Sequence, residues 1–223
     1  MSDWHIGEAS LIARIAGPIK RHMPGELRAL LPYARGEVLV FLDSPGGDGD
    51  AAREIHDMLR AHPHQITVFI SGHADSSASL IAMAGRRIWM SPSARMLLHN
   101  PVPGRAVKNA PGMRAVADAQ RGAISAQQSW HGVASVINGA ISEALAQPSA
   151  TWVEEHAAQY AKIYARRTRR PVSEMRRLME IGTDLSAQQA VAKGFADRIA
   201  VIELPREGSM GWRMPIYSHA RPS

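Results

Sequence analysis

The stretch EVLVFLDSPGG (residues 37–47) carries the clearest fold signal in the sequence. Its apolar run from Val38 to Leu42 is continuous and stops abruptly at an Asp-Ser-Pro-Gly-Gly turn. A short apolar run bounded by turn residues is typical of a strand that is buried on both faces of a parallel sheet. The stretch therefore predicts an interior strand of such a sheet.

The neighbouring segments extend this pattern. SLIARIAGPI (Ser10 to Ile19) predicts a strand that ends at Gly-Pro, and GELRALLPYA predicts a helix limited by Pro32. DAAREIHDMLRAH, directly after the turn, is amphipathic. Its apolar face consists of Ala52, Ile55, Met58 and Leu59.

QITVFIS predicts a second buried strand, and the helix that opens at Ser76 follows it. RRIWM and ARMLLHN predict further short strands. Strands that alternate with helices indicate an α/β fold built from right-handed crossovers.

The second half of the chain has a different character. From Pro111 to about Thr168 it is rich in Ala, Gln, Ser and Val, which predicts two or more helices forming an arm or cap. VSEMRRLME predicts a helix with Ser173 as N-cap, and LSAQQAVAKGFADRIAVI predicts a capped helix, a stop at Gly194 and a last strand. We expect four parts: a first part of the α/β core (1–112), an extended helical arm (113–168), a last part of the core (169–203) and a flexible tail (204–223).

Composition excludes several function classes. The 223 residues include no cysteine, which removes disulfides and thiolate chemistry. No apolar run approaches the roughly 20 residues that span a bilayer, and the first residues lack the order of a signal peptide. Much of the formal charge of +6 lies in ARRTRRP and EMRRLM, where arginine complements helix dipoles. We therefore expect a cytoplasmic protein that binds neither nucleic acid nor membrane.

Three segments that follow buried strands combine the residue types needed for acyl transfer. In DSPGG, Gly46 and Gly47 allow backbone N–H groups to approach a ligand closely. GHADSS places hydroxyl groups at the start of a helix, beside unpaired N–H groups. LLHNP ends a strand with His99. Together these segments offer a nucleophile, a general base and oxyanion donors.

The order and spacing of these segments resemble the ClpP family of serine peptidases. The pattern SPGGD…GHADSSASLIAMAG…HNP is most similar to the phage-associated, ClpP-related head maturation proteases. The resemblance implies the crotonase-like spiral of strand–strand–helix units, a polypeptide substrate, a homo-oligomer, and catalysis without a cofactor or metal. It also implies that Ser76 is the nucleophile, that His99 is the general base, and that the amides of Gly47 and Ser77 form the oxyanion hole. The short leader is a weak match to the axial loops that partner ATPases use, so we do not expect an ATPase partner.

The sequence departs from the family pattern at the third member of the catalytic triad. Counting back from Leu185, the acidic position falls on Gly182. Asp184 is the provisional third member, and Glu180 is the other nearby carboxylate. Asp75 directly precedes the nucleophile, where a small apolar residue is expected.

Other assignments remain open. His73 could replace His99 as the base, Lys108 could form a Ser–Lys dyad, and Asp184 could simply be a helix N-cap. The His-Pro-His sequence at residues 62–64 is interpreted as an exposed turn rather than a metal site. At the level of the whole protein, the alternatives are an inactive ClpP homologue that serves as an assembly subunit and a crotonase-type acyl-CoA enzyme.

Overall fold

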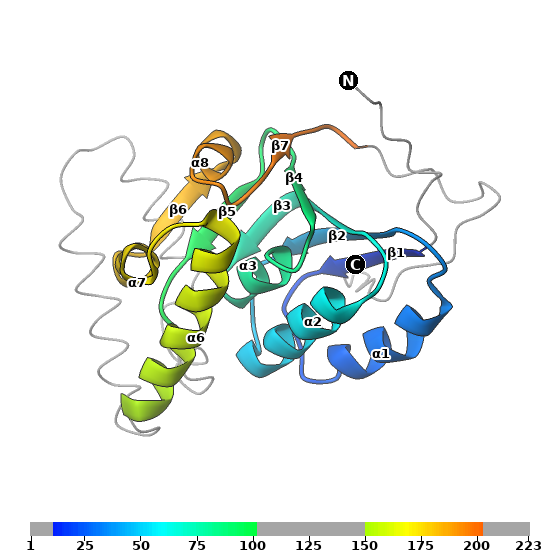
Figure 1. The fold of residues 1–223 in the computed structure, drawn as a ribbon, viewed down its shortest axis with the longest axis horizontal. Coiled ribbons are helices and arrows are strands. Elements are labelled where there is room, and N and C mark those ends of the chain that lie inside the picture. Colours follow the sequence, from blue (N-terminus) through cyan, green and yellow to red (C-terminus); the bar gives the residue numbers. More distant parts are fainter. Residues whose placement is uncertain (1–10, 102–149, 203–223) are drawn as a thin grey trace, which may run out of the picture.

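A computed structural model describes residues 11–101 and 150–202, with the side chains of residues 150–152 left out (Figure 1). The first described part contains five strands and three α-helices. In chain order these are β1 (Leu11–Ala16), α1 (Met23–Leu30), the 3-10 turn η2 (Leu31–Tyr33), β2 (Val38–Ser44), α2 (Gly49–Ala61), β3 (Ile66–Asp75), α3 (Ser77–Ala82), β4 (Arg87–Met90) and β5 (Arg95–Leu98). The second part adds α6 (Ala150–Thr168), α7 (Val172–Glu180), β6 (Thr183–Ser186), α8 (Ala187–Ala192) and β7 (Arg198–Ile199).

The strands form one sheet in the order β1-β2-β3-β4-β7, and all these pairs are parallel. β5 branches from the carboxyl half of β3, and β6 pairs with β5 in the antiparallel direction. Helices α1, α2, α3 and α6 lie on one side of this sheet (Figure 1). The α/β prediction is confirmed.

The apolar run of β2 is buried on both faces, as the sequence predicts. Val38, Val40 and Leu42 belong to the large core on the helix side, whereas Leu39 and Phe41 pack with Phe69 and Trp89 in a smaller cluster. Period-2 alternation places successive side chains on opposite faces, so the part of the strand that is covered on both sides, residues 38–42, contains no polar position.

The predicted N-cap of one helix is wrong. Ser173 is not the cap of α7, because that helix begins at Val172 and its N-cap is Pro171. The capped helix predicted from LSAQQAVAKGFADRIAVI is confirmed as α8, which Ser186 caps through a capping box with Gln189, but the strand β6 that precedes it was not predicted. Asp184 is therefore a strand residue and not a helix cap.

The expected helical arm is described only in its last part. Residues 150–168 form α6, whose residues Ala157, Tyr160, Ala161 and Tyr164 are buried in the main core. Residues 113–149 and the expected tail lie outside the described residues.

Candidate active site

Ser76 occupies a strained turn between β3 and α3. Its φ of 56° and ψ of −129° are unusual for a residue with a side chain, and only Arg169 shares a positive φ among the described non-glycine residues. Such a backbone conformation costs on the order of 1–3 kcal/mol and persists only where the surroundings impose it. Here the Ser76 N–H donates to the carbonyl of Leu97 (2.8 Å), which fixes the turn against the strand that leads to His99.

The carbonyl of Ser76 is held from the other side by Ser79. It accepts a hydrogen bond from the backbone N–H of Ser79 (3.0 Å) and another from the Ser79 hydroxyl (2.5 Å). That hydroxyl also lies 2.6 Å from the hydroxyl of Tyr164 on α6. Because a carbonyl can only accept and a serine has one hydroxyl proton, Tyr164 must donate to Ser79. Sequence reasoning missed this contact, which joins residues 85 positions apart.

The SPGG loop packs directly against this turn. A Cβ on Gly46, which has a φ of 90°, would lie 2.7 Å from the Cβ of Ser76. A Cβ on Gly47 would collide with the backbone of Ile19, which pairs with the loop through two hydrogen bonds. Only glycine lets the loop approach so closely, as expected for a backbone that serves a site.

The two expected oxyanion residues are brought together, but they bind each other. The Gly47 N–H donates to the hydroxyl of Ser77 (2.9 Å), and the Ser77 side chain is almost completely buried. An oxyanion at this position has to displace that hydroxyl.

His99 follows the last residue of β5. Its Nδ1 lies 2.6 Å from the carbonyl of Asn100, so Nδ1 carries the proton and Nε2 the lone pair. Nε2 is buried without a hydrogen-bond partner among the described residues, and burial lowers the pKa of the ring. The ring is therefore neutral at pH 7, in the tautomer that a general base requires. In this conformation no hydrogen bond joins His99 to Ser76 within the described parts of the chain.

Asp184 has a partner other than His99. Arg95 holds its carboxylate through two nitrogens, with contacts of 2.6–3.1 Å. The antiparallel register pairs Leu97 with Asp184 and Leu98 with Thr183, so the next pair would set Gly182 opposite His99. Asp184 thus lies on the same sheet face as His99 but one diagonal away, and Arg95 draws it in the other direction.

The remaining candidates have partners of their own or lie elsewhere. The backbone N–H of the exposed His73 donates to the Asp43 carboxylate (2.8 Å), and the ring Nδ1 lies 3.5 Å from the same oxygen. Glu180 is exposed at the end of α7. Lys108 lies outside the described residues. The exposed-turn interpretation of His62 is wrong, because its ring is buried and contacts the carbonyl of Leu31.

Within residues 11–101 and 150–202, no group of three His, Cys, Asp or Glu side chains could hold a metal ion. No helix in those ranges is both long and apolar enough to cross a membrane.

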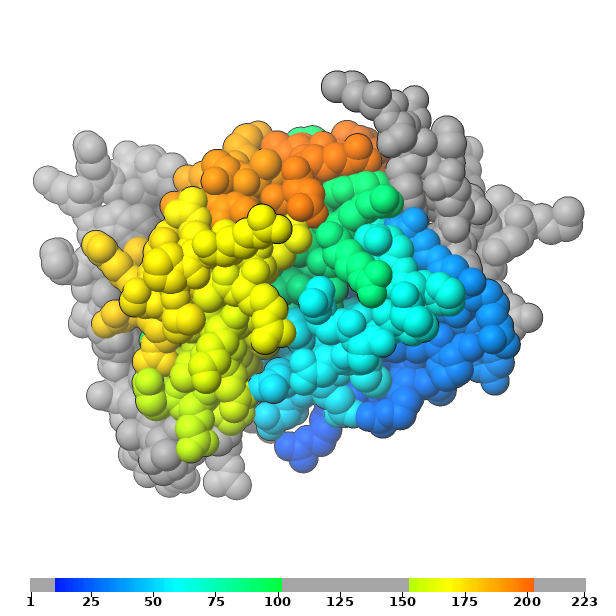
Figure 2. All heavy atoms as spheres, viewed as in Figure 1, coloured from blue at the N-terminus to red at the C-terminus, as the bar shows by residue number. Residues whose placement is uncertain are grey.

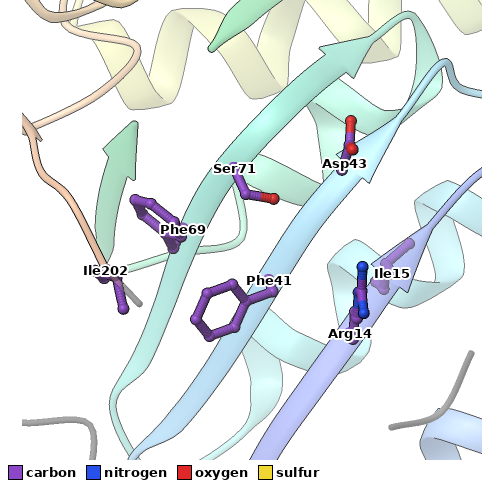
Figure 3. A pocket seen from close by; sticks show the side chains of 7 residues that line it. All are labelled: Arg14, Ile15, Phe41, Asp43, Phe69, Ser71 and Ile202. Carbon is purple, nitrogen blue, oxygen red and sulfur yellow. The ribbon is translucent and has the colours of Figure 1, made fainter. Parts of the chain in front are cut away.

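A pocket of about 200 Å³ lies beside the smaller apolar cluster. Figure 3 shows Phe41 and Phe69 on neighbouring strands, with Asp43 and Ser71 farther along. The aromatic rings pack edge to face at 5.4 Å. Neither Ser76 nor His99 lines this pocket, so it is separate from the candidate active site.

Solved structures share this arrangement of strands and helices. ClpP1 from Listeria monocytogenes matches 86% of this chain and 92% of its own with a TM-score of 0.62, at 16% sequence identity. A point mutant of the same protein gives a TM-score of 0.61. The chain has the ClpP fold.

Sequence comparisons place the ClpP-like similarity in the first half of the chain. Residues 14–121 match the family model described as Clp protease. The chain is 37% identical over 98 residues to the ATP-dependent Clp protease proteolytic subunit 2 of Treponema denticola, covering 40% of this chain and 48% of that protein. It is 36% identical over 90 residues to the subunit of the same name from Gluconobacter oxydans, covering 39% and 40%. The chain thus spans at most about half the length of these curated relatives. The residues that match the family model include Ser76 and His99.

Proposed function

We propose that this ClpP-like protein is a serine endopeptidase that cleaves polypeptides through an acyl-enzyme. The observation that carries the proposal is the strained turn at Ser76, held between the SPGG loop and the strand that leads to a neutral, buried His99. Strained residues of this kind persist only where the surrounding structure imposes them, and they cluster at active sites.

The proposed chemistry follows from these groups. His99 Nε2 takes the proton of the Ser76 hydroxyl as its oxygen attacks the substrate carbonyl. The N–H groups of Gly47 and Ser77 stabilise the oxyanion, and His99 returns the proton to the leaving amine. Water then hydrolyses the ester by the same steps in reverse order.

This chemistry requires two rearrangements from the described conformation. The Ser77 hydroxyl has to release the Gly47 N–H, and the His99 ring has to reach Ser76. Asp184 can act as the third member only after it leaves Arg95, and until then the Asn100 carbonyl orients the ring.

The finer assignments rest on the sequence pattern. The similarity of SPGGD…GHADSSASLIAMAG…HNP to phage head maturation proteases supports capsid or scaffold processing as the physiological role. We also propose that the protein is a cytoplasmic homo-oligomer that works without an ATPase partner.

One alternative has structural support. The hydrogen bond that closes the oxyanion site and the Arg95–Asp184 ion pair are both expected of an inactive homologue that serves as an assembly subunit. A crotonase-type acyl-CoA enzyme is the weaker alternative, because the Ser76–His99 pair has no role in such an enzyme. Saturable binding of CoA would support it.

Peptidase assays on three forms of the full chain distinguish these proposals. The wild type should cleave an unfolded protein such as casein, and Ser76→Ala should lose about 10³-fold or more of that activity with an unchanged Tm. Ser77→Ala is the matched control and should retain activity, because it keeps the amide and frees the Gly47 N–H. Equal activity in wild type and Ser76→Ala, or none in either, would contradict the proposal.

A further inference from the structure

A second concave site lies at the far end of α3 from Ser76. A depression of about 310 Å³ opens where α2, the turn after α3 and the end of α6 meet, and Met83 and Gly85 form part of its wall. Figure 2 shows this hollow between the cyan, green and yellow segments on the helix side of the molecule. It shares no residue with the candidate active site.

Arginine dominates the lining of this depression, and no acidic side chain of the described residues lines it. The five arginines are Arg60, Arg86, Arg166, Arg167 and Arg169. Arg167 forms an ion pair with Asp197 (2.7 Å), yet its Nε is buried without a hydrogen-bond partner among the described residues. The other four are exposed and form no ion pair within the described parts of the chain.

Nearby arginines outside the depression show that this lack of partners is local. Arg170 pairs with Glu174 at 2.7 Å, and Arg176 pairs with Glu154 at 2.5 Å. These arginines have acidic partners, whereas four of the five arginines that line the depression have none among the described residues.

Helix dipoles account for only part of the charge. The carboxyl ends of α2, α3 and α6 meet here, and each contributes roughly −0.5 charge. Three ends offset roughly 1.5 of the four unpaired positive charges, which leaves more than two. A compact ligand that carries several negative charges would balance this excess.

The backbone at Arg169 is a second, independent observation. Arg169 directly follows α6 and has a φ of 55°, in the left-handed region where helices usually end with glycine. The chain keeps a long cationic side chain at the rim of the depression although glycine would relieve the strain. Arg169 therefore contributes its guanidinium to the depression at a cost in backbone strain.

We propose that this depression binds a compact polyphosphate anion, such as a di- or triphosphate group. Guanidinium groups bind phosphate oxygens through paired N–H donors, and several of them around one small hollow match the closely spaced charges of such a chain. Carboxylate side chains of a protein partner are singly charged and more widely spaced, so they fit the hollow less well.

Calorimetric titration of the full chain with inorganic tripolyphosphate at 0.15 M salt tests the proposal. We expect saturable binding at one site per chain, and Arg86→Ala should weaken it about 10-fold or more, because it removes a charge-assisted hydrogen bond. Arg87→Ala is the matched control: Arg87 is the exposed neighbour of Arg86, lies outside the depression and faces Glu37. It should leave the affinity unchanged.

Arg169→Gly separates binding from folding. It should weaken tripolyphosphate binding while raising the Tm by roughly 1–3 °C, since it relieves the left-handed strain. If Arg169 stabilised the fold instead, Arg169→Gly would lower both the affinity for tripolyphosphate and the Tm.

Four results would overturn the proposal. These are no saturable binding at millimolar tripolyphosphate, equal losses in the Arg86 and Arg87 variants, equally tight binding of citrate, and binding of an oligonucleotide without binding of tripolyphosphate.

Discussion

The hydroxyl of Ser79 connects the strained Ser76 to the buried Tyr164, so its removal tests how the turn is held. Ser79→Ala leaves the Tyr164 hydroxyl buried without an acceptor, which costs about 1–3 kcal/mol. The better helix propensity of alanine offsets up to about 0.5 kcal/mol of this loss. For a chain of this size, the net loss of about 0.5–3 kcal/mol corresponds to a fall in Tm of roughly 1–12 °C.

The Tyr164→Phe variant should be less harmful, at about 0.5–1.5 kcal/mol, because Ser79 still donates to the Ser76 carbonyl. The double variant removes both groups and leaves no unpaired hydroxyl, so it should be no less stable than Ser79→Ala alone. Thermal unfolding of the four forms at one protein concentration measures this coupling. Strictly additive losses would show that the Ser79–Tyr164 hydrogen bond does not form.

The other predictions concern the base, its orientation and assembly. Gly182→Asp places a carboxylate opposite His99 and should speed cleavage. Asp184→Asn should lower the Tm, because the ion pair with Arg95 is lost. If Gly182→Asp left the rate unchanged and Asp184→Asn lowered turnover steeply, Asp184 would be the residue that orients His99. Burial lowers the pKa of His99, so the folded protein protonates this ring only below the ordinary value of about pH 6.5. The acid limb of a plot of cleavage rate against pH should therefore have its midpoint below about pH 6.5. A midpoint above about pH 6.5 would contradict the burial of His99. Light scattering should give a mass above that of one 24.3 kDa chain. The double variant Ile137→Glu with Ile141→Glu, at positions outside the described residues, should dissociate the oligomer before it unfolds the chain. A monomeric wild type would exclude a role of this segment in assembly.

The sequence best predicts those elements whose burial shows as a run of consecutive apolar residues. The run from Val38 to Leu42 is covered on both faces, so no tertiary information is needed to recognise it as an interior strand. β6 is the opposite case, because only Leu185 of its four residues is buried and the capping signal at Ser186 dominates the pattern. Its existence depends on the edge of β5, which lies far away in the sequence.

Site residues follow the same rule. The proximity of Ser76, Gly47 and Ser77 was predictable because each lies at a turn that ends or follows a strand, and parallel strands bring such turns to one edge. The ion pair of Arg95 with Asp184 depends on the register of β6, which the sequence pattern did not show. The buried state of His62 likewise depends on the packing of η2 against its ring.

The central claim is that Ser76 is the reactive hydroxyl, and labelling with a fluorophosphonate probe tests it most directly. Mass spectrometry of the digested full chain should locate one adduct on the peptide that carries Ser76, and none should form in Ser76→Ala. Ser77→Ala should still be labelled, and replacing His99 with alanine should slow labelling strongly. An adduct that persists in Ser76→Ala, or one that vanishes in Ser77→Ala, would contradict the account.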